Sequence, residues 1–168
     1  HPGFLTSATG PIMFGLDGMN QAAYAAGQPI PNIIGMAFSY SMTIAVLYPA
    51  FALAVLIFSK SNQLKTVGKI SIAPAFFGIS EPLMFGVPVV MNPFMAIPWI
   101  ISPMVNVLLG WLACSSGLVA RYAGVTVFNF PMGVTGILNG SFTIAILEVV
   151  VCIIDVLIFM PFVRIQDK

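Results

Sequence analysis

The chain has 168 residues, of which 59% are hydrophobic and 7% are charged, and its mean hydropathy is +1.03. This composition excludes an ordinary soluble domain and indicates an all-α polytopic membrane protein. A net charge of +1 without a basic cluster argues against nucleic acid as a partner. Cys114 and Cys152 fall in apolar segments without metal-ligand spacing, so we expect neither a metal nor another cofactor.

The first 32 residues are the least hydrophobic part of the chain. Proline and glycine positions predict one short helix from Pro11 to Ala26. Asp17 lies on this helix, and a solvated charge near the membrane interface is favoured over a binding role. Because the chain begins with His1 instead of methionine, we expect it to be a fragment whose N-terminal elements belong to a longer polypeptide.

Three uncharged or nearly uncharged segments are predicted to span a bilayer: residues 33–58, 94–120 and 141–163. At about 1.5 Å per residue, each can cross a hydrocarbon core of about 30 Å. Pro49 should kink the first span. The multi-pass chain is therefore expected in the cell membrane, with the lipid bilayer as its solvent.

Glu81 is the only residue with a formal charge between Lys69 and Arg121. A carboxylate within such an apolar run is costly and needs a functional reason. Glycine, proline and Asn-Pro breaks on both sides of it rule out a smooth spanning helix, and broken backbone at membrane depth must line a cavity or be buried in protein. We therefore predict a re-entrant hairpin over residues 70–93, with Glu81 near its tip.

The basic residues predict the topology. By the positive-inside tendency, the loop with Lys60, Lys65 and Lys69 is predicted to be cytoplasmic, and the C-terminal end lies on the same side. Arg121 would then be the only basic residue outside. The stretch over residues 122–139 has too many glycines for a span, and we interpret it as an external loop with a second irregular or re-entrant piece.

Glu148 and Asp155 lie seven residues apart on the third predicted span, which places them on one helical face. Both should point inward. A proton relay and hydrogen bonding to polar groups of adjacent helices are both compatible with this placement, and a structural role is favoured for Asp155.

Three consecutive stretches carry a family resemblance: APAFF, ISEP and LMFGVPVVMNPFMAIPWIISPMVN. In this order they resemble the sugar-transporting enzyme IIC of the bacterial phosphotransferase system, in its lactose/cellobiose/chitobiose branch. The resemblance continues through QAAYAAGQPIP, SKSNQLKTVGKI and DVLIFMPFVRIQDK. It implies the later, substrate-binding part of a homodimeric permease that presents a disaccharide to a phosphorylated cytosolic enzyme IIB.

The resemblance also implies the site. Glu81 would bind two sugar hydroxyls and could act as general base for phosphoryl transfer, while His1, Ser80 and Phe128 would lie beside the sugar. This chain departs from the family at these neighbours. The family usually has Asn at the positions of Gly78 and Ser80, Trp at Phe128, and Gly after the site His where this chain has proline.

Residues of the first span add open alternatives. Tyr40, Ser41 and Thr43 could face sugar hydroxyls, although hydroxyl side chains in membrane helices more often bond their own backbone or a neighbouring helix. For the whole chain, the alternative function is a proton- or sodium-coupled secondary transporter that uses the intramembrane carboxylates. A membrane assembly subunit without a substrate is disfavoured, because packing alone does not explain Glu81.

Overall fold

The computed structural model describes residues 9–87, 89 and 92–167. These residues form helices joined by turns and coil, with no strand in any of the described ranges, so the predicted all-α class is confirmed. The elements in chain order are α2 (Thr9–Ala25), α3 (Met36–Tyr40), the π-helix η1 (Ser41–Ala45), α4 (Leu47–Phe58), α5 (Asn62–Phe76), α6 (Glu81–Gly86), α7 (Pro93–Ser115), α8 (Val134–Leu138) and α9 (Phe142–Gln166).

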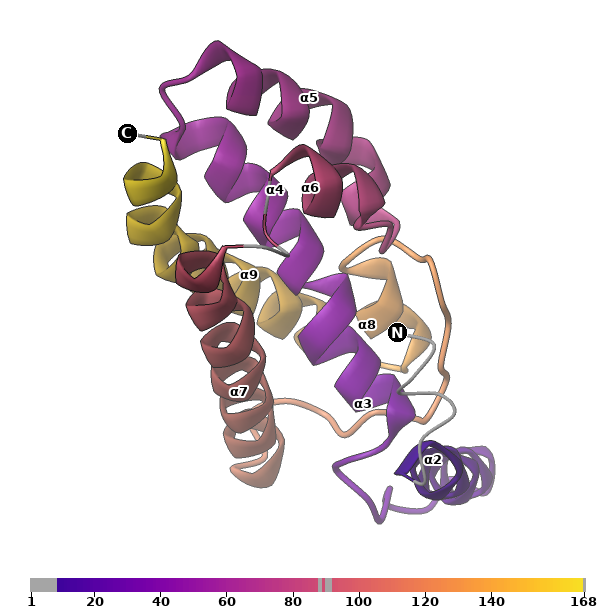
Figure 1. Cartoon of the computed structure of the whole chain (residues 1–168). Coiled ribbons are helices and arrows are strands. Elements are labelled where there is room, and N and C mark those ends of the chain that lie inside the picture. The colour runs from indigo at the N-terminus through magenta and orange to yellow at the C-terminus, as the bar shows by residue number, and fades with distance from the viewer. Residues whose placement is uncertain (1–8, 88, 90–91, 168) are drawn as a thin grey trace.

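Over the described part of the chain, three helical stretches are long and apolar enough to cross a membrane: Met36–Phe58, Pro93–Ser115 and Phe142–Gln166. The first is the central one, because 67% of its most apolar window is buried, against 28% for α7 and 44% for α9. In Figure 1 it crosses the middle of the molecule, with α5 and α6 on one side and α9 behind it. The predicted ranges 33–58, 94–120 and 141–163 each overlap one of these stretches.

Aromatic packing joins the three spanning stretches. The Phe51 ring centroid lies 4.9 Å from that of Phe159 on α9 and 5.5 Å from that of Trp99 on α7. Tyr48 packs on the same tryptophan at 5.9 Å. Buried aromatic pairs of this kind stabilise a core beyond their area alone, and here they fix the ring of Tyr48 within α4.

Helices α5 and α6 form a helical hairpin that packs on α4. The first arm starts at Asn62, eight residues before the predicted segment 70–93 begins, so Lys65 and Lys69 lie on a helix instead of in a loop. A Cβ added to Gly86 would lie 2.5 Å from Val67, which shows how closely the two arms pack. The position of this hairpin relative to a membrane stays a prediction.

The interpretation of Asp17 as a solvated charge is wrong. Its side chain is only 2% exposed, and its carboxylate accepts hydrogen bonds from the Ala37 amide at 2.8 Å and from the Thr126 hydroxyl at 2.6 Å. It thereby satisfies an orphan amide at the start of the first spanning stretch. Sequence could not reveal this contact, because it joins three segments that are distant along the chain.

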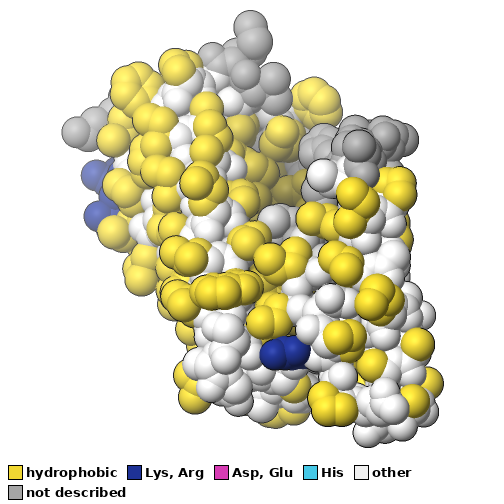
Figure 2. Space-filling view, turned by 90° about the horizontal axis from the view of Figure 1, so that it is seen from below, with side chains coloured by type: hydrophobic (Ala, Val, Ile, Leu, Met, Phe, Trp, Pro, Cys, Tyr) yellow, Lys and Arg dark blue, Asp and Glu magenta, His cyan; other side chains and the backbone are white. Residues whose placement is uncertain are grey.

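The outer surface of the molecule is largely apolar. Figure 2 shows hydrophobic side chains over much of the face seen from below, interrupted by small basic patches. On α7 the exposed set consists of Phe94, Ile97, Ile100, Ile101, Met104, Leu108, Trp111 and Leu112. Such a surface is suited to lipid or to other membrane helices and not to water.

Candidate functional site

The tip of the α5–α6 hairpin presents the carboxylate of Glu81. Helix α5 ends at Phe76, Gly78 follows with a φ of +74°, and Glu81 is the first residue of α6. The positive φ allows the sharp turn that brings the second arm back. The Glu81 side chain is exposed, and no hydrogen bond to its carboxylate is found among the residues that the structure describes. It is therefore free to accept hydrogen bonds from a ligand.

Tyr40 lies beside the hairpin tip. Its hydroxyl accepts a hydrogen bond of 2.9 Å from the backbone amide of Asn129. A Cβ added to Gly78 would lie 2.9 Å from the same hydroxyl and 3.6 Å from the Asn129 side-chain oxygen. The hairpin tip, α3 and the coil before α8 therefore meet at this hydroxyl, and a side chain at position 78 would need the Tyr40 hydroxyl to shift and would be strained by the positive φ.

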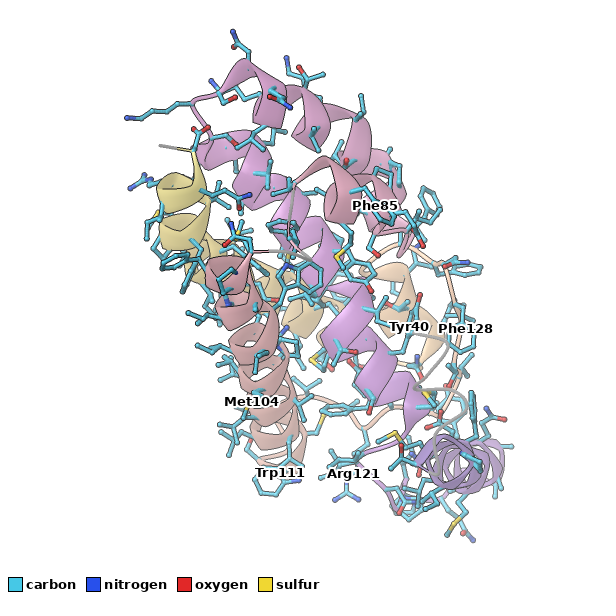
Figure 3. All side chains as sticks on the ribbon, viewed as in Figure 1. Tyr40, Phe85, Met104, Trp111, Arg121 and Phe128 are labelled. Carbon is cyan, nitrogen blue, oxygen red and sulfur yellow. The ribbon has the colours of Figure 1, made fainter. Side chains whose placement is uncertain are left out.

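Phe128 packs against Tyr40 and adds an exposed aromatic surface beside it. Its ring stands at 90° to the Tyr40 ring, with centroids 5.0 Å apart, and 42% of the residue stays exposed. The next residue, Asn129, has a φ of +59°, a value that non-glycine residues rarely adopt. Figure 3 shows Tyr40 and Phe128 together on one side of the molecule. The exposed ring offers a face on which a flat, partly apolar ligand can stack.

Tyr48, which is buried at 7% exposure, lies beside the start of α6. Its hydroxyl interacts with the side chain of Ser80 and lies within electrostatic range of Glu81 and Tyr40. The structure therefore brings the predicted residues Ser80, Glu81 and Phe128 into one cluster around two tyrosines. Sequence analysis missed Tyr48, because it stands apart from the other hydroxyl side chains of the first span and falls on a different face from Tyr40 in a continuous α-helix.

The other hydroxyls of the first span are structural. Thr43 donates to the Ser39 carbonyl one turn earlier at 2.6 Å, and Ser41 donates to the Glu148 carboxylate at 2.6 Å. Of the three side chains considered from sequence, only Tyr40 reaches the cluster. His1 lies outside the described residues, so its role in the site stays a prediction.

The site offers carboxylate acceptors, hydroxyls that both donate and accept, and an exposed aromatic ring. A sugar presents a matching set of groups, namely neighbouring hydroxyls around a ring with apolar C–H faces. Residues 1–103 match the family model described as phosphotransferase system, EIIC. The chain belongs to this family.

Relatives of known name agree with this assignment. The EIIC chain is 37% identical over 170 residues to the oligo-beta-mannoside-specific EIIC component of Bacillus subtilis strain 168, covering 98% of this chain and 38% of the relative. It is 32% identical over 177 residues to the lactose-specific EIICB component of Lacticaseibacillus casei, covering 99% of this chain and 30% of that protein.

A solved structure extends the agreement to the fold. The crystal structure of the transporter ChbC, the IIC component from the N,N'-diacetylchitobiose-specific phosphotransferase system, matches with a TM-score of 0.89 and 36% identity. The match covers 99% of the EIIC chain and 39% of ChbC. The resemblance inferred from the ISEP region is thereby confirmed, and the chain is a membrane protein. It spans less than two-fifths of the length of these relatives.

Proposed function

We propose that this chain is the substrate-binding part of a sugar permease of the phosphoenolpyruvate-dependent phosphotransferase system. It binds a disaccharide of the cellobiose, chitobiose or lactose class and presents it to phosphorylated enzyme IIB. The observation that carries the proposal is the meeting of an exposed carboxylate, Glu81, with Tyr40, Tyr48 and Phe128 at the hairpin tip. The names of the relatives support the sugar class and the pairing with a IIB component.

Glu81 has two roles in this proposal. As an acceptor-only group, its carboxylate binds two sugar hydroxyls in a fixed geometry, and Ser80 and Tyr48 add hydroxyls beside it. Phe128 stacks on the apolar face of the ring. When IIB approaches, Glu81 accepts the proton of the reacting sugar hydroxyl as the oxygen bonds to phosphorus, and the partner's phosphate-carrying group leaves.

Energy coupling distinguishes this function from ion-coupled transport. In vesicles that contain the full-length protein, uptake of labelled cellobiose or chitobiose should require phosphoenolpyruvate and the phosphorylating proteins, including IIB. It should continue when proton and sodium gradients are collapsed. Uptake driven by an imposed ion gradient without those proteins would instead favour the secondary transporter, in which the buried carboxylates would be coupling sites.

We further propose that the α5–α6 hairpin is re-entrant and that it enters and leaves the membrane from the cytoplasmic side. Single cysteines at Asn62 and Asn92, in a background without the native cysteines, should both be labelled from the cytoplasm. A cysteine at Leu118, which is 78% exposed beyond the end of α7, should be labelled only from outside. External labelling at Asn92 would contradict the hairpin.

Two further partners belong to the proposal, and the share of the relatives that the chain covers supports the first of them. We propose that an N-terminal remainder, equivalent to the unmatched part of ChbC and of the oligo-beta-mannoside component, packs on this part, and that the whole permease is a homodimer. Light scattering of the detergent-solubilised full-length protein at two concentrations tests the dimer. A mass of one chain at both concentrations would contradict it.

A further inference from the structure

The first spanning stretch departs from α-helical geometry at its centre. Residues Ser41–Ala45 form the π-helix η1, directly between α3, which ends at Tyr40, and α4, which begins at Leu47. π-helical turns are rare, usually occur as single-turn insertions in α-helices, and are frequent at functional sites. This one lies between the two tyrosines of the sugar site.

Tyr40 and Tyr48 are eight residues apart. In a continuous α-helix, at about 100° per residue, their side chains would point in directions roughly 80° apart. A π-helical turn contains one residue more than an α-helical turn. Eight residues that include such a turn therefore rotate the chain about as far as seven α-helical residues do, and the angle between the two side-chain directions falls to roughly 20°. This agrees with the two hydroxyls lying within electrostatic range of each other. Helix η1 therefore places both tyrosines on the side that faces Glu81.

Glu148 on α9 holds the start of η1. Its carboxylate accepts hydrogen bonds from the Ser41 hydroxyl at 2.6 Å, the Thr135 hydroxyl at 2.7 Å and the Gly133 amide at 2.6 Å. Since the single Ser41 proton goes to Glu148, the Tyr122 hydroxyl donates to Ser41 at 3.0 Å. The same carboxylate thus fixes η1 and the end of the coil that carries Phe128.

Asp155, two helical turns further along α9, holds the second residue of η1. The Asn106 amide of α7 donates one proton to Asp155 at 2.7 Å and the other to the backbone carbonyl of Met42 at 3.0 Å. Both partners are acceptors, so both amide protons are used. Glu148, Asp155 and Asn106 are each 0% exposed. These hydrogen bonds lie in the buried interior, where the loss of one is expensive. The second carboxylate oxygen of Asp155 and the side-chain oxygen of Asn106 have no partner among the described residues.

We infer that Glu148 and Asp155 are positioning residues of the sugar site. Through Ser41 and Asn106 they stabilise η1, and η1 aligns the hydroxyls of Tyr40 and Tyr48 for the disaccharide. The inference rests on the proposed function, because it assigns these acids a task in that same site. It accounts for two buried carboxylates on one face of α9 without a proton relay.

A double-mutant cycle tests this coupling. Disaccharide affinity of the full-length protein is measured by calorimetry for N106A, Tyr48→Phe and the double variant. N106A should weaken binding of cellobiose or chitobiose about tenfold, the loss of roughly one oriented hydrogen bond. In the Tyr48→Phe background the same change should cost much less, because the group it orients is already gone. Additive losses would overturn the inference.

The matched control is N20A. Asn20 on α2 is also buried, at 1% exposure, and its side-chain amide also donates two hydrogen bonds, here to the backbone carbonyls of Asn32 and Tyr122, neither of which belongs to η1. N20A should be destabilised like N106A without a tenfold loss of affinity. An equal loss of affinity in N20A would mean that destabilisation alone is responsible, and would overturn the inference.

Two variants of Ser41, S41A and S41T, provide a second test if N106A does not fold. S41A should lose affinity, whereas S41T, which retains the hydroxyl, should recover it, and the cycle is then repeated with Tyr40→Phe. Retained affinity in S41A would contradict the role of η1. Failure of the proposed function gives a different result: wild type would bind no disaccharide, or Glu81→Gln would bind as well as wild type.

Discussion

Glu81 at the hairpin tip and Glu148 within α9 are both carboxylates in strongly apolar sequence, but their surroundings differ completely. Glu81 is exposed and accepts no hydrogen bond from the part of the chain that the structure describes, whereas Glu148 is fully buried and accepts three. A carboxylate whose acceptors are all used stabilises the fold. One whose acceptors are all open is available to a ligand. We therefore expect the Glu81 region to serve binding and the Glu148 region to support the fold, and substitutions should affect them in opposite ways.

The largest effect should come from Glu81→Gln. Loss of charge-assisted hydrogen bonds to the sugar should cost about 2–4 kcal/mol, or roughly 30- to 1,000-fold in disaccharide affinity measured by calorimetry. The unfolding midpoint in detergent should stay nearly unchanged, since the side chain is exposed and its carboxylate accepts no hydrogen bond from the residues that the structure describes. Unchanged affinity would remove Glu81 from the site, and a large drop in the midpoint would place it with the supporting carboxylates.

The converse holds for Glu148→Leu, which should reduce stability by at least about 2 kcal/mol. The Gly133 amide and two hydroxyls lose their acceptor, and a backbone N–H cannot turn to find another. Denaturant unfolding of the purified protein measures the loss. Glu148→Gln retains one acceptor oxygen and should lose less, and Glu81→Leu should stay within about 0.5 kcal/mol of wild type. Equal losses at the two glutamates would remove the contrast.

Phe128 should show a smaller effect on binding. Its ring contributes one stacking face, so Phe128→Ala should weaken disaccharide binding by about 1 kcal/mol, or roughly fivefold. Phe128→Trp restores the residue usual in the family branch and enlarges the face, and it should bind at least as tightly as wild type. If Phe128→Ala binds normally, the ring only packs against Tyr40.

Sequence predicted one side of this contrast much better than the other. Glu81 was singled out because it is the lone charge of its segment, and the turn that the structure places beside it was predicted from the glycine and proline around it. Its role in binding stays a prediction. The seven-residue spacing of Glu148 and Asp155 correctly indicated one helical face, but it could not name their partners. Those partners, Ser41 and Asn106, come from other helices, and residue types alone do not encode such tertiary contacts.

The π-helix η1 was also beyond prediction. Apolar residues on both sides fit a continuous span, and Pro49 suggested only a kink near that point. Counted along an α-helix, Tyr40 and Tyr48 fall on different faces, so sequence did not pair them. Likewise the coil with Phe128 was predicted as irregular, but its contact with Tyr40 depends on how the chain returns from α7.

A third acid, Asp17, extends the comparison outside the spanning stretches. It is buried like Glu148, but one of its two oxygens has no hydrogen-bond partner and faces Gly35, where an added Cβ would lie 2.0 Å away. Burial raises the pKa of this carboxyl above its ordinary value of 3.8, and hydrogen bonds from Thr126 and Ala37 only partly offset it. Its charged form is therefore satisfied less well than that of Glu148.

The smallest expected effect is a pH dependence that Asp17 adds to stability. Between the ordinary value of 3.8 and the raised folded pKa, the folded protein keeps the proton that the unfolded chain has released. Stability must therefore fall as pH rises through this window, and no further change is due to Asp17 below it. Asp17→Asn keeps an acceptor for Ala37 but cannot titrate. The difference in unfolding midpoint between wild type and this variant, measured from pH 3.8 upward to about pH 8, should change in favour of wild type as pH falls. A difference that is constant with pH would show that Asp17 has the same pKa in both states, and that its second oxygen is hydrated after all.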